Sequence, residues 1–321
     1  MKILITGSAG FIGFHLAKFL INNKISVIGL DNLNNYYDVN LKKNRLNELK
    51  KNKKFTFYKI DILNKKNLNK VIRENKIKII VHLAAQAGVR YSIENPTTYH
   101  KNNLEGFFNI LEISKENKIK HLIFASTSSV YGESSNFPLN ENEDTNKPLS
   151  FYAATKKSNE VMAHSYSYIY KLPCTAVRFF TVYGPYGRPD MALFKFTKNI
   201  LENKKIELYN KGEHFRDFTY IDDIIKGIFS IIYKPKRDKV PYNIFNIGNG
   251  KSRKLIDYLF YIEKKLGKKA KIKTLPLQKG DIIKTHSDIR LLKKFSNYQP
   301  RVDIEEGISK FVDWFTDYYD Y

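Results

Sequence analysis

The 321-residue chain has one cysteine, Cys174, and no long run of apolar residues. A lone thiol cannot form a disulfide within the chain, and such a chain is typical of a reducing cytoplasm. Because no His stands near Cys174 in the sequence, we interpret it as a small strand residue and not as a catalytic thiol.

Apolar stretches such as 77–85 and 225–233 are far shorter than the ~20 residues of a membrane span. The first ten residues lack the apolar core of a signal peptide, so we expect a cytoplasmic protein without membrane association.

Acidic residues are also scarce: 32 Asp and Glu stand against 55 Lys and Arg, which gives a net charge of +23. Such an excess raises the question of nucleic-acid binding. The basic residues are mostly Lys, however, and they are scattered along the chain without a helix-turn-helix, RNA-recognition or zinc-binding pattern. The seven His residues show no metal-ligand spacing. We therefore expect neither a nucleic-acid partner nor a metal, whereas the charge favours anionic ligands.

Short apolar runs alternate with helical patterns through the first 180 residues. Helices are expected after a glycine-rich turn at 7–13, from Pro96 to near Asn117, and from Phe151 onward. Strands are expected at 2–6, 25–31, 55–61, 78–85, 120–126 and 173–180. This alternation predicts an α/β fold, a doubly wound parallel sheet of the Rossmann type with helices on both faces.

After residue 180 the pattern changes to glycines, prolines, short strands and helices. The run 243–248 could return to the parent sheet. We expect a first domain over 1–180, with returns near 217–250, and a smaller α/β domain over 181–321 packed against it.

The stretch GSAGFIG places Gly7, Gly10 and Gly13 directly after a strand and at the start of a helix. In this context the glycines permit a tight turn, the approach of a pyrophosphate and close packing of helix on strand. Asp31 ends the second strand, where its carboxylate can bind ribose hydroxyls and would repel a 2′-phosphate, so the pattern favours NAD over NADP. A second acid, Asp61, could face the adenine; its alternative role is a helix N-cap.

Tyr152 and Lys156, in YAATK, lie one helical turn apart and project from the same helix face. A lysine ammonium ~4–5 Å away would stabilise a tyrosine phenolate by ~3–4 kcal/mol at an effective dielectric constant near 20. The tyrosine could then remove a proton from a sugar hydroxyl while a hydride leaves to NAD. Such a pair is often merely structural, but beside a dinucleotide-binding turn the catalytic interpretation is favoured.

At this point the sequence resembles the extended short-chain dehydrogenase/reductase family, and within it the UDP-glucuronate 4-epimerases. The motifs that carry the resemblance run along the whole chain: GSAGFIG, DNLNNYYDVNLK, AAQAGVRYSIENP, STSSVYG, SFYAATKKSNEV, RFFTVYGPYGRPDMALFKFTK and RDFTYIDDI. The resemblance implies oxidation of C4 of a nucleotide sugar, and it makes 1–180 an NAD-binding domain and 181–321 mainly a nucleotide-sugar-binding domain. It also implies a homodimer formed through helices that include 97–117 and 151–170.

Four hydroxyl residues, Ser126 to Ser129, follow the buried run HLIFA. Related dehydratases carry Asp and Glu where this chain has Ser128 and Ser129, and related UDP-glucuronate decarboxylases carry Glu in place of Ser129. Related UDP-galactose epimerases typically carry Asn in place of Thr181. Our hypothesis is that Ser128, Ser129 and Thr181 hold a substrate carboxylate by hydrogen bonds of ~1.5–3 kcal/mol each. Thr127 resembles the residue that binds the C4 oxygen beside Tyr152, and Ser126 is interpreted as a strand-end cap.

The resemblance assigns further residues to the ligands. Arg188 would lie near the sugar and diphosphate, Arg216 on the diphosphate, Asp281 on the uridine ribose and Arg90 at the mouth of the site; each could instead be a surface residue. The remaining residues assigned to the cofactor are Phe11, Ile12, Ile62, Ala84, Ala85, Gln86 and Asn103.

The favoured function is conversion of UDP-glucuronate to UDP-galacturonate with bound NAD. The alternatives are a UDP-glucose or UDP-N-acetylglucosamine 4-epimerase, or an inactive dinucleotide-sensing protein, which the intact Tyr and Lys disfavour.

Overall fold

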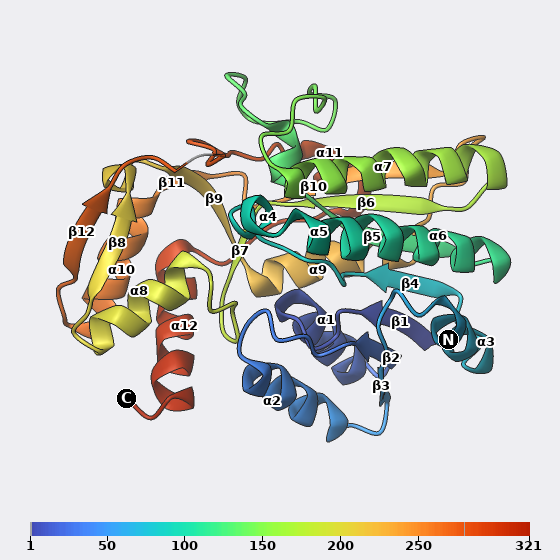
Figure 1. Cartoon of the computed structure of the whole chain (residues 1–321), viewed down its shortest axis with the longest axis horizontal. Coiled ribbons are helices and arrows are strands. Elements are labelled where there is room, and N and C mark those ends of the chain that lie inside the picture. Colours follow the sequence, from blue (N-terminus) through green and yellow to red (C-terminus); the bar gives the residue numbers. More distant parts are fainter. Residues whose placement is uncertain (1, 279) are drawn as a thin grey trace.

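The computed structural model describes residues 2–278 and 280–321. A parallel sheet of seven strands lies at its centre, in the order β10-β6-β5-β4-β1-β2-β3 (Figure 1). These strands are β1 (Lys2–Thr6), β2 (Ser26–Asp31), β3 (Phe55–Lys59), β4 (Ile79–His82), β5 (His121–Thr127), β6 (Cys174–Phe179) and β10 (Tyr242–Ile247). The doubly wound parallel sheet expected from the sequence is thus confirmed. The strand order reverses between β1 and β4, where open α/β sheets bind their ligands.

Both faces of the sheet are buried because its side chains alternate between two apolar layers. Ile3 and Ile5 of β1 enter one layer, and Leu4 enters the other. Cys174, the first residue of β6, is also buried there, and burial raises the pKa of its thiol to about 12. One face is covered by α1 (Phe11–Asn22), α2 (Val39–Lys50), α9 (Ile221–Ile232) and α11 (Arg290–Ser296), and the other by α3 (Lys65–Glu74), α6 (Gly106–Glu116) and α7 (Phe151–Tyr170).

The helix expected from Pro96 to Asn117 is present but is not regular. After the short α4 (Tyr91–Glu94), the chain forms α5 (Pro96–Tyr99), a π-helical segment η1 (His100–Glu105) and then α6. The π-helical segment widens the turn that carries Asn103. Single π turns of this kind are frequent at functional sites.

A smaller second lobe packs against the ends of the central strands (Figure 1). Its sheets consist of β7 (Thr181–Tyr183), β9 (Phe215–Tyr220) and β11 (Ser252–Lys254), and of β8 (Lys205–Tyr209) and β12 (Lys271–Leu275). Its helices are α8 (Ala192–Leu201), α10 (Leu255–Leu266) and α12 (Ile304–Tyr318), and it also contains the short 3-10 turn η3 (Asn210–Gly212). Another short 3-10 turn, η2 (Ser128–Tyr131), follows β5 of the central sheet. The expected return of 243–248 to the parent sheet is confirmed, because β10 pairs with β6.

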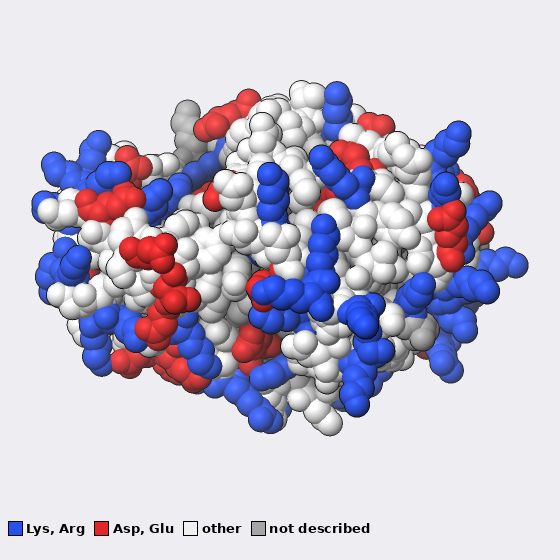
Figure 2. Space-filling view, turned by 90° about the horizontal axis from the view of Figure 1, so that it is seen from below, with Lys and Arg blue, Asp and Glu red and all other residues white. Residues whose placement is uncertain are grey.

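The basic residues are spread over the surface. Figure 2 shows Lys and Arg over the whole of the face drawn, with Asp and Glu among them. Within residues 2–278 and 280–321, none of the helices is long and apolar enough to cross a membrane.

Candidate active site

A cavity of about 990 Å³ lies between the carboxyl ends of the central strands and the second lobe. It is at the upper end of the ~300–1,000 Å³ range of ligand pockets. The sequence-predicted residues that line it are Gly7, Gly10, Phe11, Ile12, Gly13, Asp31, Ile62, Ala84, Ala85, Gln86, Arg90, Thr127, Ser128, Ser129, Tyr152, Lys156, Thr181, Arg188, Arg216 and Asp281. Tertiary structure therefore brings together residues from nearly the whole length of the chain.

Two residues that we assigned to the cofactor, Asp61 and Asn103, are not among the residues that line the cavity. Asp61 accepts hydrogen bonds from the Asn32 side chain (2.8 Å) and the Leu63 backbone (2.9 Å). It is also not the N-cap of α3, which is Asn64. Asn103 is 2% exposed. Its side-chain oxygen accepts a hydrogen bond from the Gln86 backbone N–H (2.8 Å), and its side-chain nitrogen donates one to the Gln86 carbonyl (3.0 Å). These side chains hold neighbours that line the cavity.

The glycine turn is tightly packed at each of its three glycines. Gly7 has a φ of +73°, and a Cβ there would come within 2.8 Å of the Ala84 nitrogen. A Cβ at Gly13 would collide with the Gly7 carbonyl, and one at Gly10 would lie 3.0 Å from it. The N-terminus of α1 has no side-chain cap and no acidic residue in its first turn. Its backbone N–H groups and partial positive charge are therefore available to an anionic ligand.

Asp31 ends β2 as expected and reaches back to the glycine turn. Its two carboxylate oxygens accept hydrogen bonds from the backbone of Ala9 (3.1 Å) and Leu33 (2.8 Å). Each oxygen retains a lone pair for a ligand hydroxyl. Burial raises the pKa of Asp31, while these hydrogen bonds and the nearby Lys42 ammonium oppose the rise. Lys42, which the sequence reasoning missed, lines the same part of the cavity.

Tyr152 and Lys156 both project from α7 into the cavity. Ser150 caps this helix by accepting a hydrogen bond from the Ala153 backbone, which fixes the first turn that carries Tyr152. Burial raises the pKa of Tyr152, while the Thr127 hydroxyl and the Arg188 guanidinium lower it. Burial also lowers the pKa of Lys156 to about 8. Besides Lys156, which the sequence predicts beside Tyr152, the Arg188 guanidinium is thus a second cation that favours the phenolate.

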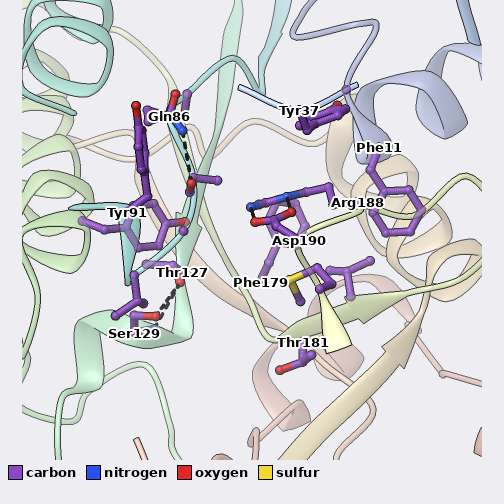
Figure 3. A pocket seen from close by; sticks show the side chains of 18 of the residues that line it. Phe11, Tyr37, Gln86, Tyr91, Thr127, Ser129, Phe179, Thr181, Arg188 and Asp190 are labelled. Atoms are coloured by element: carbon purple, nitrogen blue, oxygen red, sulfur yellow. Dashed lines mark hydrogen bonds and ion pairs between the residues drawn. The ribbon is translucent and has the colours of Figure 1, made fainter. Parts of the chain in front are cut away.

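A wall of hydroxyl groups faces the cavity beside Tyr152. The turn η2 after β5 carries Ser128 and Ser129 to the wall, and Thr127 donates to the Ser129 hydroxyl at 3.2 Å. Thr181, the first residue of β7, joins the lining from the second lobe (Figure 3). Ser126 is different, because its hydroxyl donates to the buried carboxylate of Glu160 at 2.6 Å. We name Thr127, Ser128, Ser129 and Thr181 the hydroxyl wall.

A buried ion pair that the sequence reasoning missed lies on α7, one helical turn beyond Lys156. Glu160 accepts two hydrogen bonds from Arg178 of β6, each 2.8 Å long, and both side chains are 2% exposed. Glu160 follows Lys156 by four residues, as Lys156 follows Tyr152, so the helical spacing carried a signal for it. The pair joins α7 to β6 and, through Ser126, to β5.

A second missed acid, Asp190, projects into the cavity beside Arg188 (Figure 3). The Arg188 Nε donates to Asp190 at 3.0 Å, and Tyr36 donates to the same carboxylate at 3.2 Å. Burial alone would lower the pKa of Arg188, but the Asp190 carboxylate raises it overall. The guanidinium therefore remains charged inside the cavity.

The end of the cavity farthest along the second lobe is lined by Arg216 and Asp281. Asp281 forms an ion pair with Arg90 at 3.3 Å, and the Arg90 side chain is 48% exposed. Burial lowers the pKa of Arg216 to about 10, which Asp281 opposes. This end thus presents two guanidinium groups and one carboxylate.

Residues 3–248 match the model of the NAD dependent epimerase/dehydratase family. The chain belongs to that family. The Staphylococcus aureus protein CapI is 49% identical to it over 99% of both chains. A Thermodesulfobacterium geofontis UDP-glucuronate 4-epimerase is 46% identical over 97% of this chain and 95% of its own. The Bacillus cereus UDP-glucuronic acid 4-epimerase, solved with UDP-glucuronic acid and NAD, has a TM-score of 0.94 at 36% identity, covering 99% of this chain and 100% of that one.

The residues of this epimerase-family member fit a dinucleotide. The crowded glycines leave backbone N–H groups at an uncapped helix end for the pyrophosphate, and Asp31 offers its remaining lone pairs to a ribose. Tyr152 and Lys156 stand at the other side of the same cavity, next to the hydroxyl wall. The geometry can therefore place a redox cofactor between the glycine turn and Tyr152.

Proposed function

We propose that this chain catalyses the C4 epimerisation of UDP-glucuronate to UDP-galacturonate with bound NAD. The single observation that carries this proposal is the hydroxyl wall beside Tyr152. Four neutral hydroxyl groups line this part of the cavity, and two of them, Ser128 and Ser129, stand where related dehydratases or decarboxylases carry acids. The name of the Thermodesulfobacterium geofontis relative gives independent support.

Residues of the glycine turn, Asp31 and the 84–86 backbone would hold NAD, which supplies the acceptor, and later the donor, of a hydride. Asn103 and Asp61 contribute indirectly, because they fix Gln86 and Asn32 in the cavity wall. The N-terminal end of α1 would neutralise part of the pyrophosphate charge.

Tyr152 would accept the proton of the sugar C4 hydroxyl as the hydride leaves C4. Thr127 and Arg188 lower the pKa of Tyr152 against the effect of burial, so both favour the phenolate that this step needs. The ring of the 4-keto sugar would then turn over, and C4 would regain the hydride on its other face while Tyr152 returns the proton to O4. Net oxidation is zero, because the same hydride leaves and returns.

The hydroxyl wall would restrain the carboxylate of the keto sugar. A 4-keto uronic acid is a β-keto acid, and it loses CO₂ when its carboxylate bond aligns with the carbonyl π system. Hydrogen bonds from Ser128, Ser129 and Thr181 would hold the carboxylate near the ring plane, at ~1.5–3 kcal/mol each. An acidic residue at this wall would repel the substrate instead.

Incubation of the purified protein with UDP-glucuronate, UDP-glucose or UDP-N-acetylglucosamine tests the proposed function, with products resolved by NMR. We expect rapid conversion of the uronate alone. Faster conversion of a neutral sugar would favour the UDP-glucose-type alternative. A folded protein that binds NAD and converts none of the three would be a dinucleotide-sensing protein.

The variant Ser129→Glu tests the hydroxyl wall. Two like charges ~4 Å apart repel by ~4 kcal/mol at an effective dielectric constant of 20, so we expect at least a ~10-fold lower kcat/KM for UDP-glucuronate. We also expect a UDP-pentose among the products, measured by NMR. Ser135→Glu, an exposed residue of the following loop, is the matched control. Unchanged epimerisation without a pentose product would remove the support for this role.

The remaining assignments place the nucleotide along the second lobe. Arg216 would contact the diphosphate because a guanidinium offers two parallel donors to phosphate oxygens. Arg188 would lie near the sugar and diphosphate, Asp281 would bind the uridine ribose, and Arg90 would cover the mouth of the cavity.

The NAD-binding domain would then comprise 1–180 with returns near 217–250, and 181–321 would bind mainly the nucleotide sugar. The single buried thiol supports a cytoplasmic location.

A homodimer formed through α6 and α7 is part of the same proposal. These helices pack side by side on one face of the central sheet (Figure 1). Their outer faces expose apolar side chains: Phe108 is 46% exposed, Val161 59%, Tyr168 56% and Ile169 59%. Residues 161, 168 and 169 follow the spacing i, i+7, i+8, so they lie on one face of α7, as the apolar residues of a packed helix do. Contiguous exposed apolar surface of this kind marks interfaces.

Replacing Ile169 with Glu would put a charge in the centre of this stripe, so we expect monomers at concentrations at which the unaltered chain is dimeric. Sedimentation velocity measures the change. Ile272→Glu is the matched control, because Ile272 is a 45% exposed isoleucine of the second lobe. An Ile169→Glu chain that sediments like the control would rule out this interface.

A further inference from the structure

His214 lines the same cavity but has no role in the function proposed above. It lies between η3 and β9, two residues before Arg216, and is only 3% exposed. Its Nε2 has no hydrogen-bond partner among residues 2–278 and 280–321. A buried polar atom without a partner costs ~1–3 kcal/mol, so such an atom in a cavity wall points to a ligand.

The surroundings of the imidazole decide what kind of ligand group it can meet. The Nε2 lies 3.9 Å from the Oδ2 of Asp281, beyond hydrogen-bond distance. Burial lowers the pKa of His214, and the guanidinium groups of Arg216 and Arg90 lower it further, against Asp281 and the backbone carbonyl of Tyr209. The ring is therefore neutral near pH 7. Of the two tautomers of the neutral ring, the one with its proton on Nδ1 leaves a lone pair on Nε2 that can accept a hydrogen bond.

We propose that His214 Nε2 accepts a hydrogen bond from a ribose hydroxyl of the nucleotide substrate, beside Asp281. This inference rests on the proposed function, and it adds a positioning residue for the uridine. A ribose diol presents two adjacent O–H donors, which match two acceptors 3.9 Å apart. A diphosphate offers acceptors only and would meet the lone pair of Nε2 unfavourably, whereas Arg216 suits it.

Binding of UDP and of 2′,3′-dideoxy-UDP, measured by calorimetry on the NAD-loaded protein, tests the inference. The variant His214→Leu keeps a similar volume and removes the acceptor. We expect it to weaken UDP binding by ~10-fold, the equivalent of ~1.4 kcal/mol. Its affinity for dideoxy-UDP should match that of the unaltered protein within ~2-fold, because that ligand has no hydroxyl to donate. His214→Gln, which offers an oxygen near the position of Nε2, should recover much of the UDP affinity.

Equal weakening for both ligands would mean that His214 only shapes the lobe, and unchanged UDP binding would mean that it does not touch the ribose; either result overturns the inference. Exposed His100, outside the cavity lining, provides the control variant His100→Leu. The experiment also distinguishes a failure of this inference from a failure of the proposed function. If the unaltered protein fails to bind UDP, the proposed function itself is wrong. If the unaltered enzyme is active and the His214→Leu variant binds UDP with unchanged affinity, this inference alone is contradicted.

Discussion

Replacing Tyr152 with Phe is expected to lower kcat for uronate epimerisation by ~10²–10⁴-fold, the usual contribution of a general acid–base group. The substitution removes one oxygen atom and keeps the aromatic ring, whose centroid lies 6.0 Å from that of the Tyr99 ring. The proton of the sugar C4 hydroxyl then has no acceptor on α7, so hydride cannot leave C4. Substrate and cofactor contacts elsewhere in the cavity are unchanged. NMR of the products gives kcat, and calorimetry with UDP gives the nucleotide affinity.

A loss in kcat with unchanged UDP affinity and NAD content identifies the hydroxyl as the reacting group. Tyr233→Phe serves as the control, because Tyr233 is 46% exposed at the end of α9. A Tyr152→Phe enzyme that retains a tenth or more of the original kcat would require another base.

Replacing Glu160 with Leu is expected to lower the free energy of unfolding by ~3–5 kcal/mol, because it leaves the buried guanidinium of Arg178 without its partner. The Ser126 hydroxyl would lose its acceptor as well. Urea denaturation followed by circular dichroism measures the change. The effect should be large because both partners are only 2% exposed, whereas surface ion pairs contribute ~0–1 kcal/mol.

The double variant Glu160→Leu with Arg178→Met separates a charge effect from a packing effect. It removes both charges at once, so it should recover much of the stability that the single variant loses. A double variant that is less stable than Glu160→Leu would show that packing around the two side chains matters more than their charges. The exposed pair of Lys51 and Glu48 offers a control, because its removal should change stability little.

Local features of the sequence predicted most of what is local in the structure. The glycine spacing, the strand that ends at Asp31 and the pair on α7 depend on residues within a few turns of one another, and these arrangements are found where they were expected. The helix predicted from Pro96 to near Asn117 is confirmed, and it contains a π-helical turn that the sequence did not predict. That turn bears Asn103, whose long-range bonds to Gln86 and Thr155 override the local preference of the helix.

The sequence by itself determined the doubly wound sheet, the glycine turn and the presence of Tyr152 beside Lys156, because periodicity and spacing act over short distances along the chain. Only the tertiary structure decided which side chains reach the cavity and which stand behind it. Asp61 accepts a hydrogen bond from Asn32, and Glu160 accepts two from Arg178, 18 residues further along. His214 approaches Asp281 only because β9 and the segment before α11 fold against each other. The pKa of each buried group depends on such neighbours, and spacing along the chain does not reveal them.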